Sequence, residues 1–149
     1  LGWNYRMPDI NAALGLSQLN KLAMFASRRR QLTRAYDDLL AGLGPQISSP
    51  TGRAGVDPCR HLYAVQIDFE AVGKSRGRVM TELREQGVGT QVHYIPVHQH
   101  PYYTGLYGRQ TLPGAERHYA RTLSLPLYPM MEDDDPARVV AALKRVLGL

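Results

Sequence analysis

A helix predicted near the start of the chain is apolar or small on all of its sides, which limits the folds that the chain can adopt. Residues 7–43 have a continuous helical pattern, and Pro8 suits its first turn, where a missing N–H costs nothing. From Ile10 to Leu16 no side of this helix is charged, and such a helix is normally buried all round. A lone domain of 149 residues has little core to spare for that cover. Because the chain also begins with Leu1 rather than methionine, we expect it to be part of a longer protein whose missing domain or partner subunit covers the helix.

Farther along the same helix the apolar positions fall on one side, at spacings of three and four residues. This side is formed by Leu22, Phe25, Arg29, Leu32, Tyr36, Leu39, Leu40 and Leu43. Gly42 and Gly44 end the helix, and residues 48–58 are predicted to form a loop rich in glycine, proline and serine. The later turns therefore need cover on one face only.

The rest of the chain alternates between strand-like and helix-like patterns. In chain order these patterns first predict a strand at residues 61–69, a helix from the cap Ser75 to Gln86 with Gly87 as its stop, and a strand at 88–95. They then predict a loop at 96–112, a short helix around 115–121, an extended piece at 123–127 and a final helix from Asp135 to Gly148. This order is typical of an α+β (or α/β) sandwich in which a long N-terminal helix and later helices cover a small sheet.

The charge of the chain gives no sign of a nucleic-acid partner. The 18 Lys+Arg against 13 Asp+Glu leave a formal net charge of +5. The most basic run is Arg28, Arg29 and Arg30, but successive helical residues point about 100° apart, so the three cannot face one phosphate backbone. We therefore interpret the run as a solvated helix face and predict no nucleic-acid binding.

Membrane and compartment signals are equally simple. The chain contains no run of about 18 apolar residues, so we predict no membrane-spanning helix. Cys59 is its one cysteine and cannot form an internal disulfide. That is typical of a reducing compartment, so we expect the protein in the cytoplasm.

Two groups of side chains suggest a metal site, and each has a simpler explanation. His93, His98 and His100 lie within eight positions, but they are bounded by prolines and lack the rigid spacing that zinc ligands normally have. The acidic run at residues 132–135 comes directly before a helix, where carboxylates complement the N-terminal dipole. We predict no metal, and keep a histidine site as a weaker alternative.

Two segments resist a purely structural explanation. Asn4 and Arg6 come just before a helix start, where anions can bind. The residues Gln91, Val92, His93 and Tyr94 place polar side chains at the end of a predicted strand, which is where α/β proteins usually have their sites.

At these segments the sequence resembles the DegT-type nucleotide-sugar aminotransferases, which use pyridoxal phosphate (PLP). The match starts with the Gly-Trp-Asn-Tyr-Arg-Met segment at residues 2–7 and continues in the expected order through residues 10–19, 28–30 with Tyr36, 89–98, 101–103, 113–116 and 123–129. Within the family, the Gln-Val-His-Tyr and Ser-Leu-Pro-Leu-Tyr segments are most similar to transaminases of pseudaminic acid biosynthesis, which make UDP-4-amino-4,6-dideoxy-N-acetyl-β-L-altrosamine.

The resemblance implies a homodimeric enzyme of the aspartate-aminotransferase fold with shared active sites. It implies that an amino group passes from L-glutamate, by way of PLP, to C4 of a UDP-4-keto-6-deoxy sugar in bacterial surface-sugar biosynthesis. It further implies that residues 1–20 lead in from a large domain that the chain lacks, and that residues 21–149 are the C-terminal small domain.

The same resemblance suggests roles for individual residues. Asn4 would reach the cofactor phosphate and substrate of the neighbouring subunit, and Gln91, Val92, His93 and Tyr94 would line the sugar-nucleotide pocket. Arg6 is a plausible anion clamp, since a guanidinium can bind carboxylate or phosphate with two parallel hydrogen bonds.

The family's cofactor lysine lies in a His-x-x-Lys-Pro type segment, which this chain lacks. Its lysines are Lys21, Lys74 and Lys144, and none has that context. We therefore expect no catalytic residue in this chain, no activity from it alone and no PLP bound by it alone. The alternative is a stand-alone, non-catalytic domain that binds a nucleotide sugar or another anion.

Overall fold

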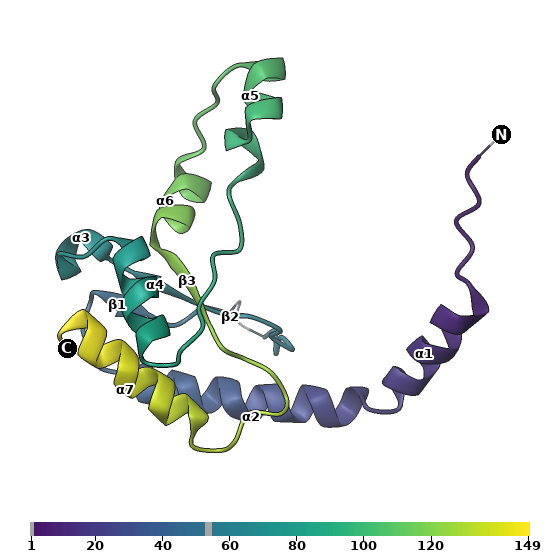
Figure 1. Ribbon diagram of the computed structural model, residues 1–149, viewed down its shortest axis with the longest axis horizontal. Coiled ribbons are helices and arrows are strands. Elements are labelled where there is room, and N and C mark those ends of the chain that lie inside the picture. Colours follow the sequence, from purple (N-terminus) through teal and green to yellow (C-terminus); the bar gives the residue numbers. More distant parts are fainter. Residues whose placement is uncertain (1, 53–54) are drawn as a thin grey trace.

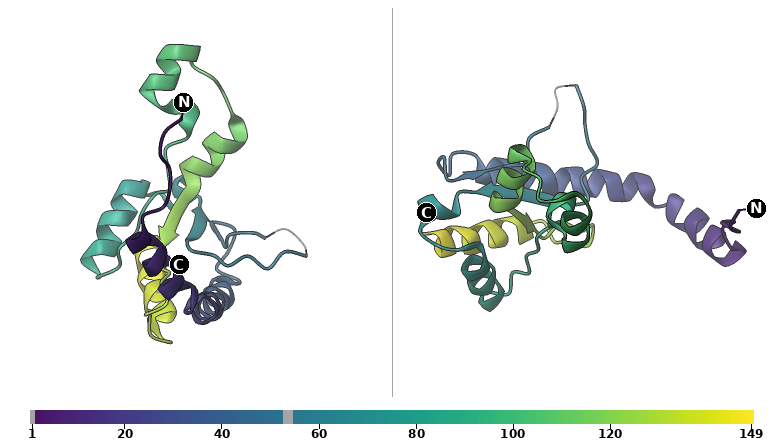
Figure 2. Two further views of the ribbon diagram at one scale, coloured as in Figure 1. Left: turned by 90° about the vertical axis from the view of Figure 1, so that its right-hand side faces the viewer. Right: turned by 90° about the horizontal axis from the view of Figure 1, so that it is seen from above.

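The computed structural model describes residues 2–52 and 55–149. It shows a compact body from which two segments project (Figure 1). One is the N-terminal arm, formed by residues 2–8 and helix α1 (Asp9–Leu19), which continues beyond the end of helix α2 (Leu22–Leu40). The other, which we call the tyrosine arm, comprises residues 96–112 and extends away from the sheet in the perpendicular view as well (Figure 2).

The expected single helix over residues 7–43 is two helices. The chain turns at Asn20 and Lys21, where the Lys21 N–H reaches back three residues to the carbonyl of Gln18 rather than four. Asparagine is a weak helix former, and no residue of α1 is buried, so packing does not hold the two helices in one line. At the other end α2 stops at Leu40, before Gly42 and its positive φ.

A small antiparallel sheet lies at the centre of the body. Its strands are β1 (Ile47–Ser48), β2 (Tyr63–Ile67) and β3 (Thr122–Leu125), in that order across the sheet. Tyr63 pairs with Leu125 and Val65 with Leu123, so these four side chains point to the same face. The strand predicted for residues 61–69 is confirmed at Tyr63–Ile67, where Tyr63, Val65 and Ile67 are all buried. Its predicted ends are wrong, because His61 is exposed before the strand and Phe69 begins a helix.

Three helices bring their apolar sides to that face. They are α2, α4 (Arg76–Glu85) and α7 (Asp135–Leu147), with α7 packed on both of the others (Figure 1). With the sheet they form one core, whose fully buried members include Leu32, Tyr36, Tyr63, Val65, Ile67, Val79, Leu83, Leu123 and Leu143. An antiparallel sheet covered by helices makes this an α+β domain, as the sequence predicts.

The predicted start and stop signals of α4 and α7 are confirmed. The Ser75 hydroxyl caps α4 by accepting a hydrogen bond from the Arg78 N–H at 3.3 Å. Helix α7 has Pro136 in its first turn and ends at Gly148, whose φ of 73° lies in the left-handed region. Both helices are therefore bounded by their own sequence signals and not by packing alone.

The region between α4 and β3 differs from the expectation. Residues 96–112 were expected to be a loop, but they contain the 3-10 turn η1 (Val97–Gln99) and helix α5 (Pro101–Tyr107), and helix α6 (Pro113–Arg121) follows. Prolines at the first turns of α5 and α6 favour these helices. A one-turn helix α3 (Phe69–Val72), capped by Asp68, also went unpredicted. Of the predicted 48–58 loop, residues 53–54 lie outside the described residues.

The arginine run is not a solvated face. Arg28 bonds to Asp133 and to the Met131 carbonyl, and Arg29 donates to the carbonyls of His61 and Leu127 at 3.1 and 3.0 Å. Arg30 pairs with Asp57 at 2.9 Å. The three guanidinium groups diverge as helical geometry requires, but each is half-buried and ties α2 to another segment.

Among the described residues, none of the helices combines the length and the apolar character needed to cross a bilayer. Cys59 is a free, exposed thiol.

Candidate functional site

The 91–94 segment is attached to the outer edge of β3 at one point. Gln91 and Ser124 exchange two main-chain hydrogen bonds, of 3.2 and 2.8 Å. The strand expected at residues 88–95 is therefore wrong, because pairing is limited to this isolated bridge. Tyr94 and Ile95 are 75% and 52% exposed, so burial of these two side chains does not hold the end of the segment against the sheet.

Within this segment the His93 ring is held on two sides. Its Nδ1 lies 2.9 Å from the Ser124 hydroxyl oxygen, and its ring meets that of Tyr94 edge to face, with the centroids 4.8 Å apart. The Gln91 side-chain oxygen accepts a hydrogen bond from the Val92 N–H. The peptide bond between His93 and Tyr94 is cis. Predicted site residues thus form one ordered, partly exposed group at the sheet edge.

The other two histidines, His98 and His100, make their hydrogen bonds away from the His93 ring. His98 Nε2 lies 3.2 Å from a Glu116 carboxylate oxygen, and His100 Nε2 lies 3.1 Å from the Ile95 carbonyl. The same Glu116 oxygen accepts the Leu112 N–H, so this contact closes the base of the tyrosine arm. The pKa of Glu116 is held below its usual value mainly by this backbone hydrogen bond and, to a smaller extent, by the hydrogen bond with His98. Over residues 2–52 and 55–149, no three His, Cys, Asp or Glu side chains are placed to hold a metal ion together.

Asn4 and Arg6 lie apart from the 91–94 segment. The Asn4 side-chain oxygen accepts the Arg6 backbone N–H at 3.3 Å, and both residues are exposed. They precede α1 on the N-terminal arm, which points away from the sheet in Figure 1 and in the right-hand view of Figure 2. One copy of the chain therefore does not bring the two predicted halves of the site together.

The tyrosine arm carries a hollow that the sequence analysis missed. A cavity of about 430 Å³ is lined by Pro96, Val97, His98, Tyr103, Tyr107, Gly108, Gln110, Leu112 and Ala115. Its aromatic side chains come from α5, a helix placed in a loop by the sequence prediction. Pro101 at the first helical position, followed by Tyr103 and Tyr107 four residues apart, is the signal that could have found it.

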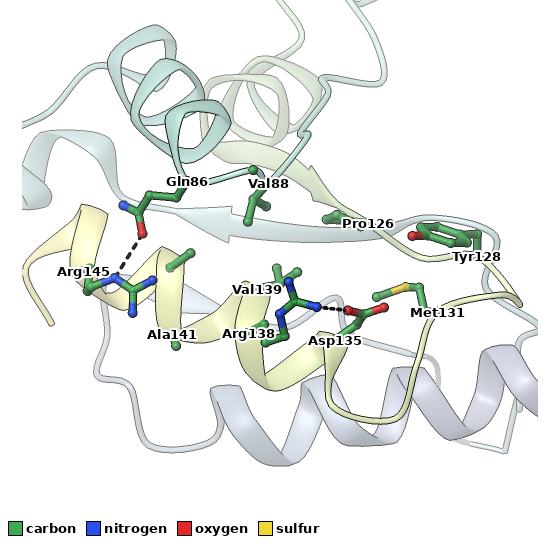
Figure 3. Close-up of a pocket in the computed structure, with 12 residues that line it drawn as sticks. Gln86, Val88, Pro126, Tyr128, Met131, Asp135, Arg138, Val139, Ala141 and Arg145 are labelled. Atoms are coloured by element: carbon green, nitrogen blue, oxygen red, sulfur yellow. Dashed lines mark hydrogen bonds and ion pairs between the residues drawn. The ribbon is translucent and has the colours of Figure 1, made fainter.

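A second cleft of about 430 Å³ lies between α7 and the segment that follows β3 (Figure 3). Its cations already have partners within the chain. Arg138 pairs with Asp135 at 3.0 Å, and Arg145 donates to the Gln86 side-chain oxygen at 3.0 Å. These contacts hold α7 to itself and to the end of α4, so we assign the cleft a structural role.

No lysine lies within the 91–94 group. The Lys74 ammonium donates to Glu82 and to the Val146 carbonyl at the end of α7, at 2.7 and 2.5 Å. Lys21 is at the turn between α1 and α2, and Lys144 is in α7. Gln91, His93 and Tyr94 offer an amide, an imidazole and a phenol as hydrogen-bonding groups, and none of the four side chains of the group carries an amine.

Comparison with known proteins shows the family of the chain. Residues 1–144 match the DegT/DnrJ/EryC1/StrS aminotransferase family model. The spore coat polysaccharide biosynthesis protein SpsC of Bacillus subtilis is 38% identical over 149 aligned residues, which cover 98% of this chain and 38% of SpsC. The chain thus spans about two fifths of the length of such relatives.

Solved structures give the same answer for the fold. Helicobacter pylori PseC, an aminotransferase involved in the biosynthesis of pseudoaminic acid, superposes with a TM-score of 0.89 at 24% identity, over 99% of this chain and 39% of PseC. NtdA of Bacillus subtilis, solved with bound cofactor PMP, gives a TM-score of 0.85 at 30% identity, over 99% of this chain and 34% of NtdA. The fold is that of the PLP-dependent sugar aminotransferases, and the chain belongs to the DegT/DnrJ/EryC1/StrS aminotransferase family.

Proposed function

We propose that the complete protein is a PLP-dependent aminotransferase that moves an amino group from L-glutamate to C4 of a UDP-4-keto-6-deoxy sugar. Residues 21–149 are its C-terminal small domain, and residues 1–20 lead in from a large domain. The observation that carries the proposal is the family match over residues 1–144, which includes the ordered 91–94 group. The relative SpsC, a spore coat polysaccharide biosynthesis protein, favours bacterial surface-sugar biosynthesis. We propose pseudaminic acid as the specific pathway because the Gln-Val-His-Tyr and Ser-Leu-Pro-Leu-Tyr segments resemble those of its transaminases.

The chain's own residues bind and orient the sugar nucleotide in this proposal. Gln91, Val92, His93 and Tyr94 line the pocket, with the His93 ring held by Ser124 and the exposed Tyr94 ring offering an apolar face to the ligand. The anchoring of Gln91 to β3 places these groups on the rigid body of the domain.

Asn4 and Arg6 act in the neighbouring subunit of a homodimer. The Asn4 amide hydrogen-bonds to the cofactor phosphate and the substrate, and the Arg6 guanidinium binds a carboxylate or phosphate. Their exposure on a projecting arm supports this arrangement, because the arm can reach a site on another copy.

PLP, when bound, supplies the electron sink that stabilises a carbanion at the carbon bearing the transferred nitrogen. We propose that its lysine and its pyridine-binding aspartate belong to sequence outside these 149 residues, so the chain alone is inactive. The engagement of Lys74 by Glu82 and Val146 supports this proposal. We place the protein in the cytoplasm, in line with its free thiol.

Kinetics of the complete enzyme test the proposal. We expect His93→Ala to raise the KM for a UDP-4-keto-6-deoxy sugar, and Asn4→Ala to weaken binding of PLP or of that sugar. His61→Ala, which removes an exposed histidine elsewhere, serves as the control. Unchanged kinetics in both site variants would contradict the site, and absence of transamination with UDP-sugar binding retained would favour a non-catalytic binding domain.

The isolated chain gives a second test. Incubation of the 149-residue chain with PLP and borohydride should leave no stoichiometric adduct at any one lysine. A single modified lysine at full occupancy would contradict the proposal that the catalytic lysine lies elsewhere.

A further inference from the structure

Ser124 is buried on the side of β3 that faces away from the core. Its neighbours Leu123 and Leu125 point into the core, so the Ser124 side chain points to the opposite face. It is nevertheless only 5% exposed. A buried hydroxyl requires a hydrogen-bond partner, and the one it has is His93, 31 residues earlier in the chain.

The same residue holds the 91–94 segment in two ways. Its main chain exchanges two hydrogen bonds with Gln91, and its side chain bonds to Nδ1 of His93. Within the described residues, Nδ1 is the His93 ring nitrogen with a recorded hydrogen bond. The other nitrogen, Nε2, is therefore the one left for a ligand.

We propose that Ser124 is a positioning residue for the sugar-nucleotide pocket. Its hydroxyl fixes the ring orientation of His93, so that Nε2 rather than Nδ1 is presented to the ligand. This inference rests on the proposed function, because it takes His93 to be a residue of that pocket.

The physical reason is the near symmetry of the imidazole ring. Half a turn about the bond that joins the ring to the Cβ atom moves Nδ1 to the other side of the ring and displaces Nε2. The edge-to-face contact with the Tyr94 ring, with the centroids 4.8 Å apart, restrains the ring but does not distinguish its two nitrogens. A hydrogen bond to Nδ1 does distinguish them. The serine hydroxyl can donate to a neutral ring or accept from a protonated one, so it holds the ring in either state.

Kinetics of the complete enzyme give the first measurement. Loss of one such hydrogen bond by Ser124→Ala should raise the KM for a UDP-4-keto-6-deoxy sugar about three- to tenfold, with kcat changed less than about twofold. Ser124→Thr retains the hydroxyl and should restore the KM. Thr122→Val is the matched control, since Thr122 is equally buried on the same strand but makes no contact with His93 that the structure records.

Nitrogen-15 spectra of His93 in the same variants of the 149-residue chain give a second measurement that does not depend on activity. Ser124→Ala should shift the Nδ1 resonance and change the tautomer ratio, Ser124→Thr should return both, and Thr122→Val should leave both unchanged. Unaltered His93 resonances in Ser124→Ala would overturn the inference.

The two measurements also separate this inference from the function on which it rests. If His93→Ala raises the KM while Ser124→Ala leaves both KM and spectra unchanged, the positioning role is wrong and the pocket stands. If Ser124→Ala alters the spectra but neither variant alters the KM, the hydrogen bond is supported and the assignment of His93 to the pocket is wrong.

Discussion

Helices α1 and α7 start in the same way and end up in opposite environments. Both have an aspartate in the first turn, and a proline precedes or opens each of them. Yet α1 has no buried residue, whereas α7 buries Pro136, Val139, Val140, Ala142, Leu143, Val146 and Leu147. Local sequence thus determines where each helix begins, and packing determines how much each contributes to stability.

The surface of α1 makes the contrast sharper. Ile10 is 82% exposed, Leu14 61% and Leu16 67%, and Trp3 and Tyr5 before the helix are more exposed still. Large apolar side chains exposed together on one segment mark a contact surface. In the proposed complete protein this arm is covered by the large domain and the neighbouring subunit.

The largest expected effect comes from truncating the same residue type in the two helices. Leu143→Ala in α7 should lower the free energy of unfolding by about 2–5 kcal/mol, because Leu143 is fully buried. Leu14→Ala in α1 should change it by less than about 0.5 kcal/mol. Urea unfolding of the two variants of the 149-residue chain measures both, and equal losses would remove the distinction between the helices.

The second effect concerns association of the chain. We expect the 149-residue chain to self-associate through α1, and Leu14→Glu combined with Leu16→Glu to return it to a monomer, because charge replaces exposed apolar surface. Ser17→Glu with Gln18→Glu adds the same charge without removing apolar side chains and should leave association unchanged. Light scattering decides the matter, and a monodisperse monomer of the unsubstituted chain would refute the expectation.

A smaller effect is expected at the C-terminal end of α7. Lys74→Met removes the ammonium that binds the Val146 carbonyl and Glu82. Hydrogen bonds from Lys74 and Arg78 lower the pKa of Glu82 from 4.5. The stabilisation that accompanies a lowered carboxyl pKa is present above the unfolded pKa and is lost as the pH falls through the folded one.

Thermal unfolding of the parent chain and of Lys74→Met, measured at several pH values, tests this pH dependence. The variant should be less stable than the parent near pH 7, by less than Leu143→Ala, and the difference should shrink as acid protonates Glu82. A difference that grew in acid would show that Lys74 acts in some other way.

The smallest expected effects on stability come from replacing glycine by alanine at two positions, and they are opposite in sign. Gly15→Ala in α1 meets nothing within 4 Å of the new Cβ atom and should raise local helix stability by about 0.5–1 kcal/mol. Gly148→Ala should destabilise α7 by about 1 kcal/mol, because φ of 73° is unfavourable for alanine. Helical circular dichroism serves for the first and thermal unfolding for the second. Effects of the same sign would mean that one of the two backbone conformations differs from that described.

Sequence patterns predicted the parts of the fold that depend on nearby residues. The Ser75 cap, the Gly148 stop and the alternation in β2 are each visible within a few positions. The strand expected at residues 88–95 was wrong because its pairing depends on the short β3, more than thirty residues away. The turn at Asn20 was missed because a helix pattern does not show whether anything packs on it.

The residues of the candidate site could be predicted from the local sequence, but their contacts could not. Gln91 to Tyr94 could be chosen from residue types and position, but nothing in the local pattern pairs His93 with Ser124. Asn4 and Arg6 are predicted together with them, yet the chain places both on the N-terminal arm, apart from the 91–94 segment. In the homodimer that we propose, the two halves of the site come from different copies, and the order of residues along one chain does not show this.

The sheet itself has a consequence for how copies of the chain can meet. Its two outer edges are β1, with two residues, and β3, where Gln91 occupies the middle of the free edge. An incoming strand therefore finds few unpaired main-chain N–H and C=O groups to extend. We therefore expect copies of the chain to associate through the exposed side chains of α1 and not by adding strands to the sheet.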